Sequence, residues 1–87
     1  MSTREDIAPI FEKALAIVDD RETLYGDLWK KSGKEVTIPE VFRKANYIKA
    51  QYEKGRYAGN EKFKEDLLDI MNWAAFSVWH LEQEKKI

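Results

Sequence analysis

Acidic residues near the start of the last predicted helix have the types and spacing of a cation site. Asp69 follows Asp66 by three positions and Glu65 by four, so the three side chains share one side of a helix. Carboxylates suit Mg²⁺, which takes a few protein oxygens and binds substrate phosphates through its other positions. Alternatively, acidic groups in a first turn complement the helix dipole without binding an ion. The spacing predicts a Mg²⁺ site and leaves the dipole interpretation open.

Four other residues are candidates for contacts with a bound phosphate compound. Asn72 interrupts an apolar run, and a buried amide needs a partner, which is a backbone carbonyl, a symmetry mate or a ligand. Lys49 and Arg43 are candidate phosphate contacts, or else solvated surface charges. Trp29 could stack on a base, although aromatic residues at helical spacing also form cores.

The second half of the last predicted helix is apolar nearly all round. Trp73, Phe76 and Trp79 place large side chains outside its ordinary core stripe. Two other helices cannot easily surround such a helix, so a second subunit is expected to cover it. We therefore predict a homo-oligomer, most simply a two-fold dimer in which copies of this helix approach each other.

The first helix that positions these candidates is expected from about residue 3 to about residue 24. Ser2 and Glu5 form a capping-box pair, and apolar residues then recur at helical spacing. Gly26 is where this helix kinks or stops, and the choice between the two stays open.

The next two helices have clear start signals. Thr37 is the expected cap of the second helix, with Pro39 in its first turn and Gly55 just beyond its end near residue 54. Asn60 is the expected cap of the third helix, which should run from about residue 61 to about residue 84. These three main helices predict an all-α fold.

The segment between the first two predicted helices, residues 30–36, is polar and lacks apolar periodicity. It is predicted to be a mobile loop. Residues 30–57 carry eight basic and three acidic groups. This basic segment could bind phosphate, or it could form a solvated helix face.

Length and composition exclude several classes of protein. A chain of 87 residues forms one small domain, 1–87, and without cysteine it has neither a disulfide scaffold nor a thiol nucleophile. With His80 as its one histidine, the chain cannot build a multi-histidine metal site. The N-terminus has no signal-peptide pattern, so a cytoplasmic protein is expected. A net charge of −1 makes nucleic-acid binding an unlikely function, and no membrane association is expected.

Three runs of residues occur in a characteristic order. They are Leu24-Tyr25-Gly26-Asp27-Leu28-Trp29-Lys30-Lys31-Ser32-Gly33, Tyr47-Ile48-Lys49-Ala50-Gln51 and Glu65-Asp66-Leu67-Leu68-Asp69-Ile70-Met71-Asn72-Trp73-Ala74. In these runs the chain resembles a family of small phage and bacterial proteins, the nucleotide modification associated domain 1 family. That family is similar to the MazG-like all-α nucleoside triphosphate pyrophosphohydrolases, and the likeness covers roughly residues 20–82.

The resemblance implies a MazG-like helical domain and a site for a (deoxy)nucleotide with Mg²⁺. Asp66 and Asp69 match one acidic pair of that superfamily, with Glu65 as an alternate ligand, and Asn72 matches the asparagine that faces the nucleotide. In an active enzyme, a metal-activated water would hydrolyse the bond between the α- and β-phosphates.

The other acidic pair of the superfamily has no counterpart here. The predicted second helix offers basic and amide side chains in its place, namely Arg43, Lys44, Asn46, Lys49 and Gln51. Two readings therefore stay open beside an active enzyme. One is a degenerate member that only binds a nucleotide, and the other is a non-enzymatic protein–protein interaction module.

Overall fold

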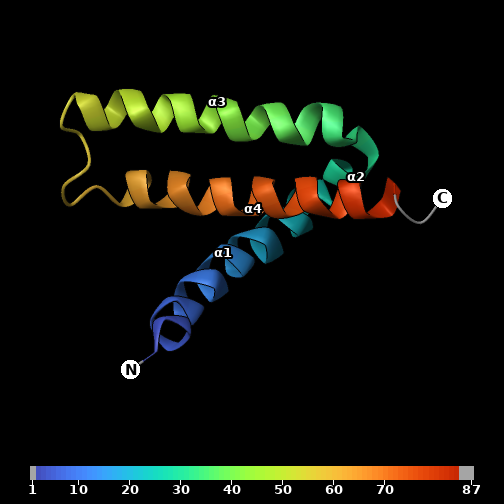
Figure 1. The fold of residues 1–87 in the computed structure, drawn as a ribbon, viewed down its shortest axis with the longest axis horizontal. Coiled ribbons are helices and arrows are strands. Elements are labelled where there is room, and N and C mark those ends of the chain that lie inside the picture. The colour runs from blue at the N-terminus through green and yellow to red at the C-terminus, as the bar shows by residue number, and fades with distance from the viewer. Residues whose placement is uncertain (1, 85–87) are drawn as a thin grey trace.

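The structure is a computed structural model that describes residues 2–84, and its regular elements are four helices (Figure 1). They are α1 (Thr3–Tyr25), α2 (Leu28–Ser32), α3 (Lys34–Glu53) and α4 (Glu61–Glu84). The predicted all-α fold is confirmed. None of these helices combines the length and apolar character needed to cross a bilayer.

The long helices α3 and α4 form an antiparallel hairpin, and α1 crosses α4 at an angle (Figure 1). The N-terminal half of α1 projects away from the hairpin, while its C-terminal end lies near the short helix α2. The chain therefore has one well-packed pair of helices and one helix that packs mainly against α4.

The two ends of α1 follow from local signals. The Ser2 hydroxyl accepts a hydrogen bond from the Glu5 amide at 3.2 Å, which confirms the predicted capping box. At the other end, Gly26 adopts a positive φ of 63°, and its amide donates to the Glu22 carbonyl at 2.9 Å. Glycine takes this conformation without the steric cost that a Cβ brings, so the helix stops here rather than kinking.

The prediction of a mobile loop over residues 30–36 is wrong. Most of this segment is helical, in the end of α2 and the start of α3, and Gly33 with φ 80° supplies the break. The lysines here are good helix formers and need no apolar periodicity when they point to solvent. Thr37 is therefore not the cap of α3. It lies in the helix's first turn, and its amide donates to the Gly33 carbonyl at 3.2 Å.

The turn between α3 and α4 confirms both predicted signals. Gly55 has φ 73°, and the amide of Arg56 donates to the carbonyl of Gln51 at 3.0 Å in a Schellman arrangement. Asn60 then caps α4, because its side-chain oxygen accepts from the Phe63 amide at 3.2 Å.

The interior of the described chain is unusually polar. Ala14 and Ile48 are its buried apolar residues. The buried polar residues outnumber them and are Thr37, Asp66, Asp69, Asn72 and Ser77. Four of these five lie on α4, so the helix expected to carry the chemistry also forms the polar centre of the fold.

Candidate functional site

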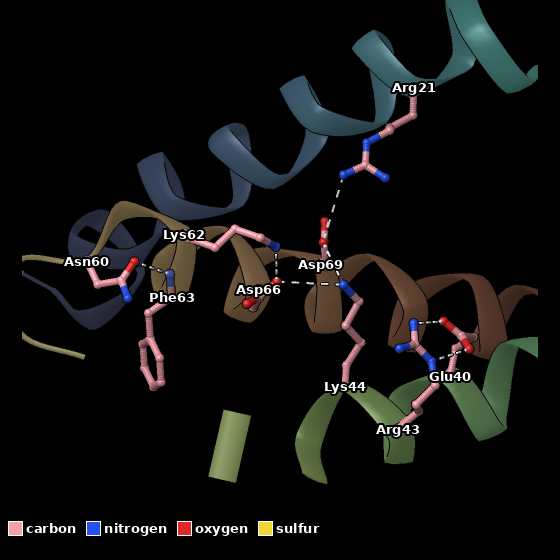
Figure 2. A network of polar contacts seen from close by, with 9 residues as sticks. All are labelled: Arg21, Glu40, Arg43, Lys44, Asn60, Lys62, Phe63, Asp66 and Asp69. Atoms are coloured by element: carbon pink, nitrogen blue, oxygen red, sulfur yellow. Dashed lines mark hydrogen bonds and ion pairs between the residues drawn. The ribbon is translucent and has the colours of Figure 1, made fainter. Parts of the chain in front are cut away.

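The two aspartates of the predicted cation site lie in the polar centre and are paired with basic groups from three helices (Figure 2). Asp66 is 2% exposed and Asp69 is 7% exposed. Lys44 of α3 places its Nζ 3.6 Å from Oδ1 of Asp66 and 3.2 Å from Oδ2 of Asp69. The Lys44 ammonium therefore lies between two carboxylates one turn apart and compensates both.

Two more cations complete this network. Lys62, one turn earlier on α4, donates to Oδ1 of Asp66 at 2.7 Å, and this hydrogen bond raises the pKa of Lys62 above its usual range. Arg21 of α1 approaches Oδ2 of Asp69 at 3.9 Å (Figure 2). Two acidic side chains thus face three basic ones, and the network ties α1, α3 and α4 together.

This pairing changes what the predicted Mg²⁺ site requires. A metal ion at Asp66 and Asp69 would have to displace Lys44, which is only 18% exposed. Glu65 is exposed, and residues 2–84 contain no group of three acidic or histidine side chains arranged to hold a metal. Mg²⁺ at this site stays a prediction, and any ion here would need most of its ligands from a bound phosphate.

Asn72 continues the same side of α4 by one turn and connects it to α1. Its Nδ2 donates to the carbonyl of Ala14 at 3.0 Å. Of the partners expected for this amide, the backbone carbonyl is thus the one that the structure shows. A carboxamide oxygen can accept two hydrogen bonds, so Oδ1 keeps its acceptor capacity while Nδ2 is engaged.

A cavity of about 380 Å³ lies between α1, α2 and α4 and contains part of the predicted site. Asp69 and Asn72 line it together with Trp29, so three predicted site residues meet at one place. Its remaining lining is Ile17, Val18, Arg21, Glu22, Tyr25, Gly26, Leu28, Ser32, Trp73 and Phe76. This volume falls within the range of small-molecule sites, which are commonly apolar clefts with a few polar groups.

The aromatic wall of the cavity is fixed by packing within the chain. The Trp29 ring stacks on Phe76 with centroids 4.3 Å apart and planes 11° from parallel. Trp73 packs nearly perpendicular to Phe76, and Trp79 packs nearly perpendicular to Trp29. Of the three residues predicted to lie in an oligomer interface, Trp73 and Phe76 are half-buried and line the cavity, and Trp79 is 37% exposed.

His80 anchors this wall. Its Nε2 lies 2.9 Å from the Trp29 carbonyl, which can only accept, so Nε2 carries the proton. This half-buried histidine therefore links α4 to α2.

Arg43 and Lys49 are not brought to the cavity. The Arg43 guanidinium donates twice to the Glu40 carboxylate, at 2.7 Å each, on an exposed part of α3 (Figure 2). These hydrogen bonds lower the pKa of Glu40 below its usual range. Lys49 is exposed and does not line the cavity.

Sequence reasoning missed the roles of Lys44 and Arg21. Lys44 was visible only as one polar residue among several on the second helix, because a single sequence does not show that two helices pair in this register. Arg21 has a local signal, since it lies two turns beyond Ala14 on the side by which α1 faces α4.

Comparisons with protein-family models, with curated proteins and with solved structures give no match for this chain. The family assignment suggested by the sequence therefore stays a prediction.

Proposed function

We propose that this protein binds a (deoxy)nucleotide in the cavity between α1, α2 and α4. The observation that supports the proposal is that Trp29 of α2 lines the same cavity as Asp69 and Asn72 of α4, although Trp29 is far from the other two in sequence. A nucleotide needs a flat apolar surface, hydrogen-bond acceptors and a cationic group, and this cavity offers all three.

The base is the part of the ligand that the cavity fits best. Trp73 and Phe76 supply aromatic surface, on which a base can stack. Asn72 and Asp69 present oxygens that accept hydrogen bonds from amino and imino groups of a base. A cavity of this volume encloses a nucleoside and leaves the phosphates at the mouth.

Arg21 is the residue that we assign to the phosphates. Its side chain is 61% exposed, it lines the cavity, and its guanidinium can bind phosphate oxygens in a bidentate manner. Because Lys44 and Lys62 already compensate the aspartates, Mg²⁺ is proposed to arrive with the phosphates rather than to bind beforehand. The proposal covers binding and assigns no turnover.

A non-enzymatic interaction module is the second candidate function. One observation favours it: many large apolar side chains are exposed, Leu24 by 75% and Phe42 by 64% among them. Exposed apolar surface of this extent is typical of proteins that bind other chains. Both functions can coexist, because most of this surface lies away from the cavity.

Thermal unfolding with a panel of nucleotides at millimolar concentration tests the proposal. A bound nucleotide stabilises the folded state by mass action, so Tm should rise by several degrees with nucleotide and Mg²⁺ present. Asp69→Ala should remove most of this rise, with circular dichroism showing that the variant is folded. A Tm that no nucleotide in the panel changes would rule out binding, and an unchanged rise in Asp69→Ala would remove this residue from the site.

A further inference from the structure

One face of α1 carries a heptad-like pattern that the fold leaves uncovered. Side chains spaced alternately four and three residues apart line one side of this helix, with apolar residues in the middle and a charge at each end. They are Arg4, Ala8, Phe11, Leu15, Val18 and Glu22. This spacing is the signature of helices that pack against another helix along a continuous seam.

Most of the seam does not face the rest of the chain, because all of its residues except the half-buried Val18 are exposed. Ala14 and Arg21 mark the side of α1 that contacts α4, and the seam lies roughly a quarter turn around the helix from it. Phe11 and Leu15 are each 53% exposed at its centre, and Ile7 beside them is 45% exposed. Burial against another helix would provide free energy that these side chains do not gain while they are exposed to water.

The surface of the chain is also larger than a compact monomer needs. A folded monomer of 10.3 kDa exposes about 5,400 Å², and this chain exposes 6778 Å². Its radius of gyration is 14.5 Å, against about 12 Å for a compact domain of this length. Two copies together carry an excess of about 2,800 Å², which falls in the size range of obligate homodimer interfaces.

We infer that a second copy of this chain covers the α1 seam and packs against it in the antiparallel direction. The charges at the two ends select the direction. An antiparallel pair places Arg4 of the partner subunit beside Glu22, whereas a parallel pair would bring like charges together at both ends. In the same register, Phe11 meets the partner's Leu15, and Ala8 meets the partner's Val18.

This pairing also reaches the cavity. Val18 and Glu22 belong both to the seam and to the cavity lining, so the partner's Arg4 would lie at the cavity rim. The inference does not rest on nucleotide binding, because it is tested by molecular mass alone.

Light scattering after size-exclusion chromatography tests the seam. The wild-type chain at tens of micromolar should have the mass of a dimer, and Leu15→Glu should have the mass of a monomer. Leu15 is half exposed within one copy, so this variant should keep its helical circular dichroism. The matched control is Leu24→Glu, which also places a carboxylate on α1 but off the seam, and it should stay dimeric. A monomeric wild type, or equal masses for the two variants, would overturn the inference.

A charge swap tests the direction. Arg4→Glu and Glu22→Arg should each weaken self-association about tenfold or more, because each places like charges at both ends of an antiparallel pair. Mixed in equal amounts, the two variants should form a heterodimer of wild-type affinity, since both ends are then complementary. Single variants that self-associate as tightly as the wild type, as a parallel pair would allow, or a mixture that associates no more tightly than either variant alone, would contradict the antiparallel arrangement.

Discussion

The ammonium of Lys44 lies 3.2 Å from Oδ2 of Asp69. A positive charge from α3 therefore lies where the sequence predicts a metal ion. The same ammonium is 3.6 Å from Asp66. This contact makes Asp66 and Asp69 part of an ion-pair network that links the helices. We therefore propose the neighbouring cavity, rather than the aspartates alone, as the ligand site.

Removing Lys44 should destabilise the protein strongly. Lys44→Met leaves two buried carboxylates with Lys62 and the more distant Arg21, and breaking one partner of a buried ion pair costs about 3 kcal/mol or more. Urea unfolding measures the loss. Lys13→Met, on an exposed part of α1, is the control and should change the free energy of unfolding by less than about 0.5 kcal/mol. Equal effects of the two substitutions would show that the network contributes no stability.

Magnesium alone should leave the wild-type Tm unchanged, because Lys44 and Lys62 already compensate Asp66 and Asp69. Lys44→Gln removes the central ammonium, so millimolar Mg²⁺ should raise the Tm of that variant. Thermal unfolding with Mg²⁺ and with an equal ionic strength of NaCl separates specific binding from screening. A clear rise in the wild type without nucleotide would mean that the metal displaces Lys44.

Thr37 should be replaceable with a gain in stability. Its side chain is fully buried, and no described residue is a hydrogen-bond partner of its Oγ1. Thr37→Val keeps the shape and removes the unsatisfied hydroxyl, so the free energy of unfolding should rise by about 1 kcal/mol and Tm by about 5 °C. The control is Thr23→Val, because the exposed Thr23 hydroxyl donates to the Asp20 carbonyl. A lower Tm for Thr37→Val would indicate that the hydroxyl has a partner in solution.

The ion pair of Glu40 and Arg43 should give a small, pH-dependent contribution to stability. The hydrogen bonds from Arg43 lower the pKa of Glu40 in the folded state, so the pair stabilises the fold above the unfolded-state pKa of about 4.5. This contribution is lost as the pH falls through the lowered, folded-state pKa. Glu40→Gln should therefore reduce Tm slightly at pH 7 and not below about pH 3. A difference that persists in acid would have to come from packing.

Local signals allowed much of the fold to be predicted from the sequence. The Ser2 cap, the Gly55 stop and the Asn60 cap each act within a few residues, and all three are found where expected. The start of α3 was misplaced because Thr37 and Pro39 imitate a helix start. The helix in fact begins earlier, after the left-handed Gly33.

The candidate site was harder to predict because its chemistry depends on contacts between helices. The positions of Asp66, Asp69 and Asn72 on one side of α4 follow from helical spacing. Their partners Lys44, Arg21 and the Ala14 carbonyl come from two other helices. The pairing of α3 with α4 decides the Lys44 contacts, and the crossing of α1 over α4 decides the other two. Neither arrangement can be deduced from the local sequence.

Calorimetric titration with a panel of (deoxy)nucleoside triphosphates and Mg²⁺ measures binding at the proposed nucleotide site. We expect saturable binding by the wild type and about tenfold weaker binding by Arg21→Gln, since a charge-assisted contact to phosphate contributes about 1.4 kcal/mol or more. Arg56→Gln, an equal change of charge in the turn between α3 and α4, should bind as the wild type does. If no nucleotide binds, or if the two variants have equal affinities, the proposed site is wrong.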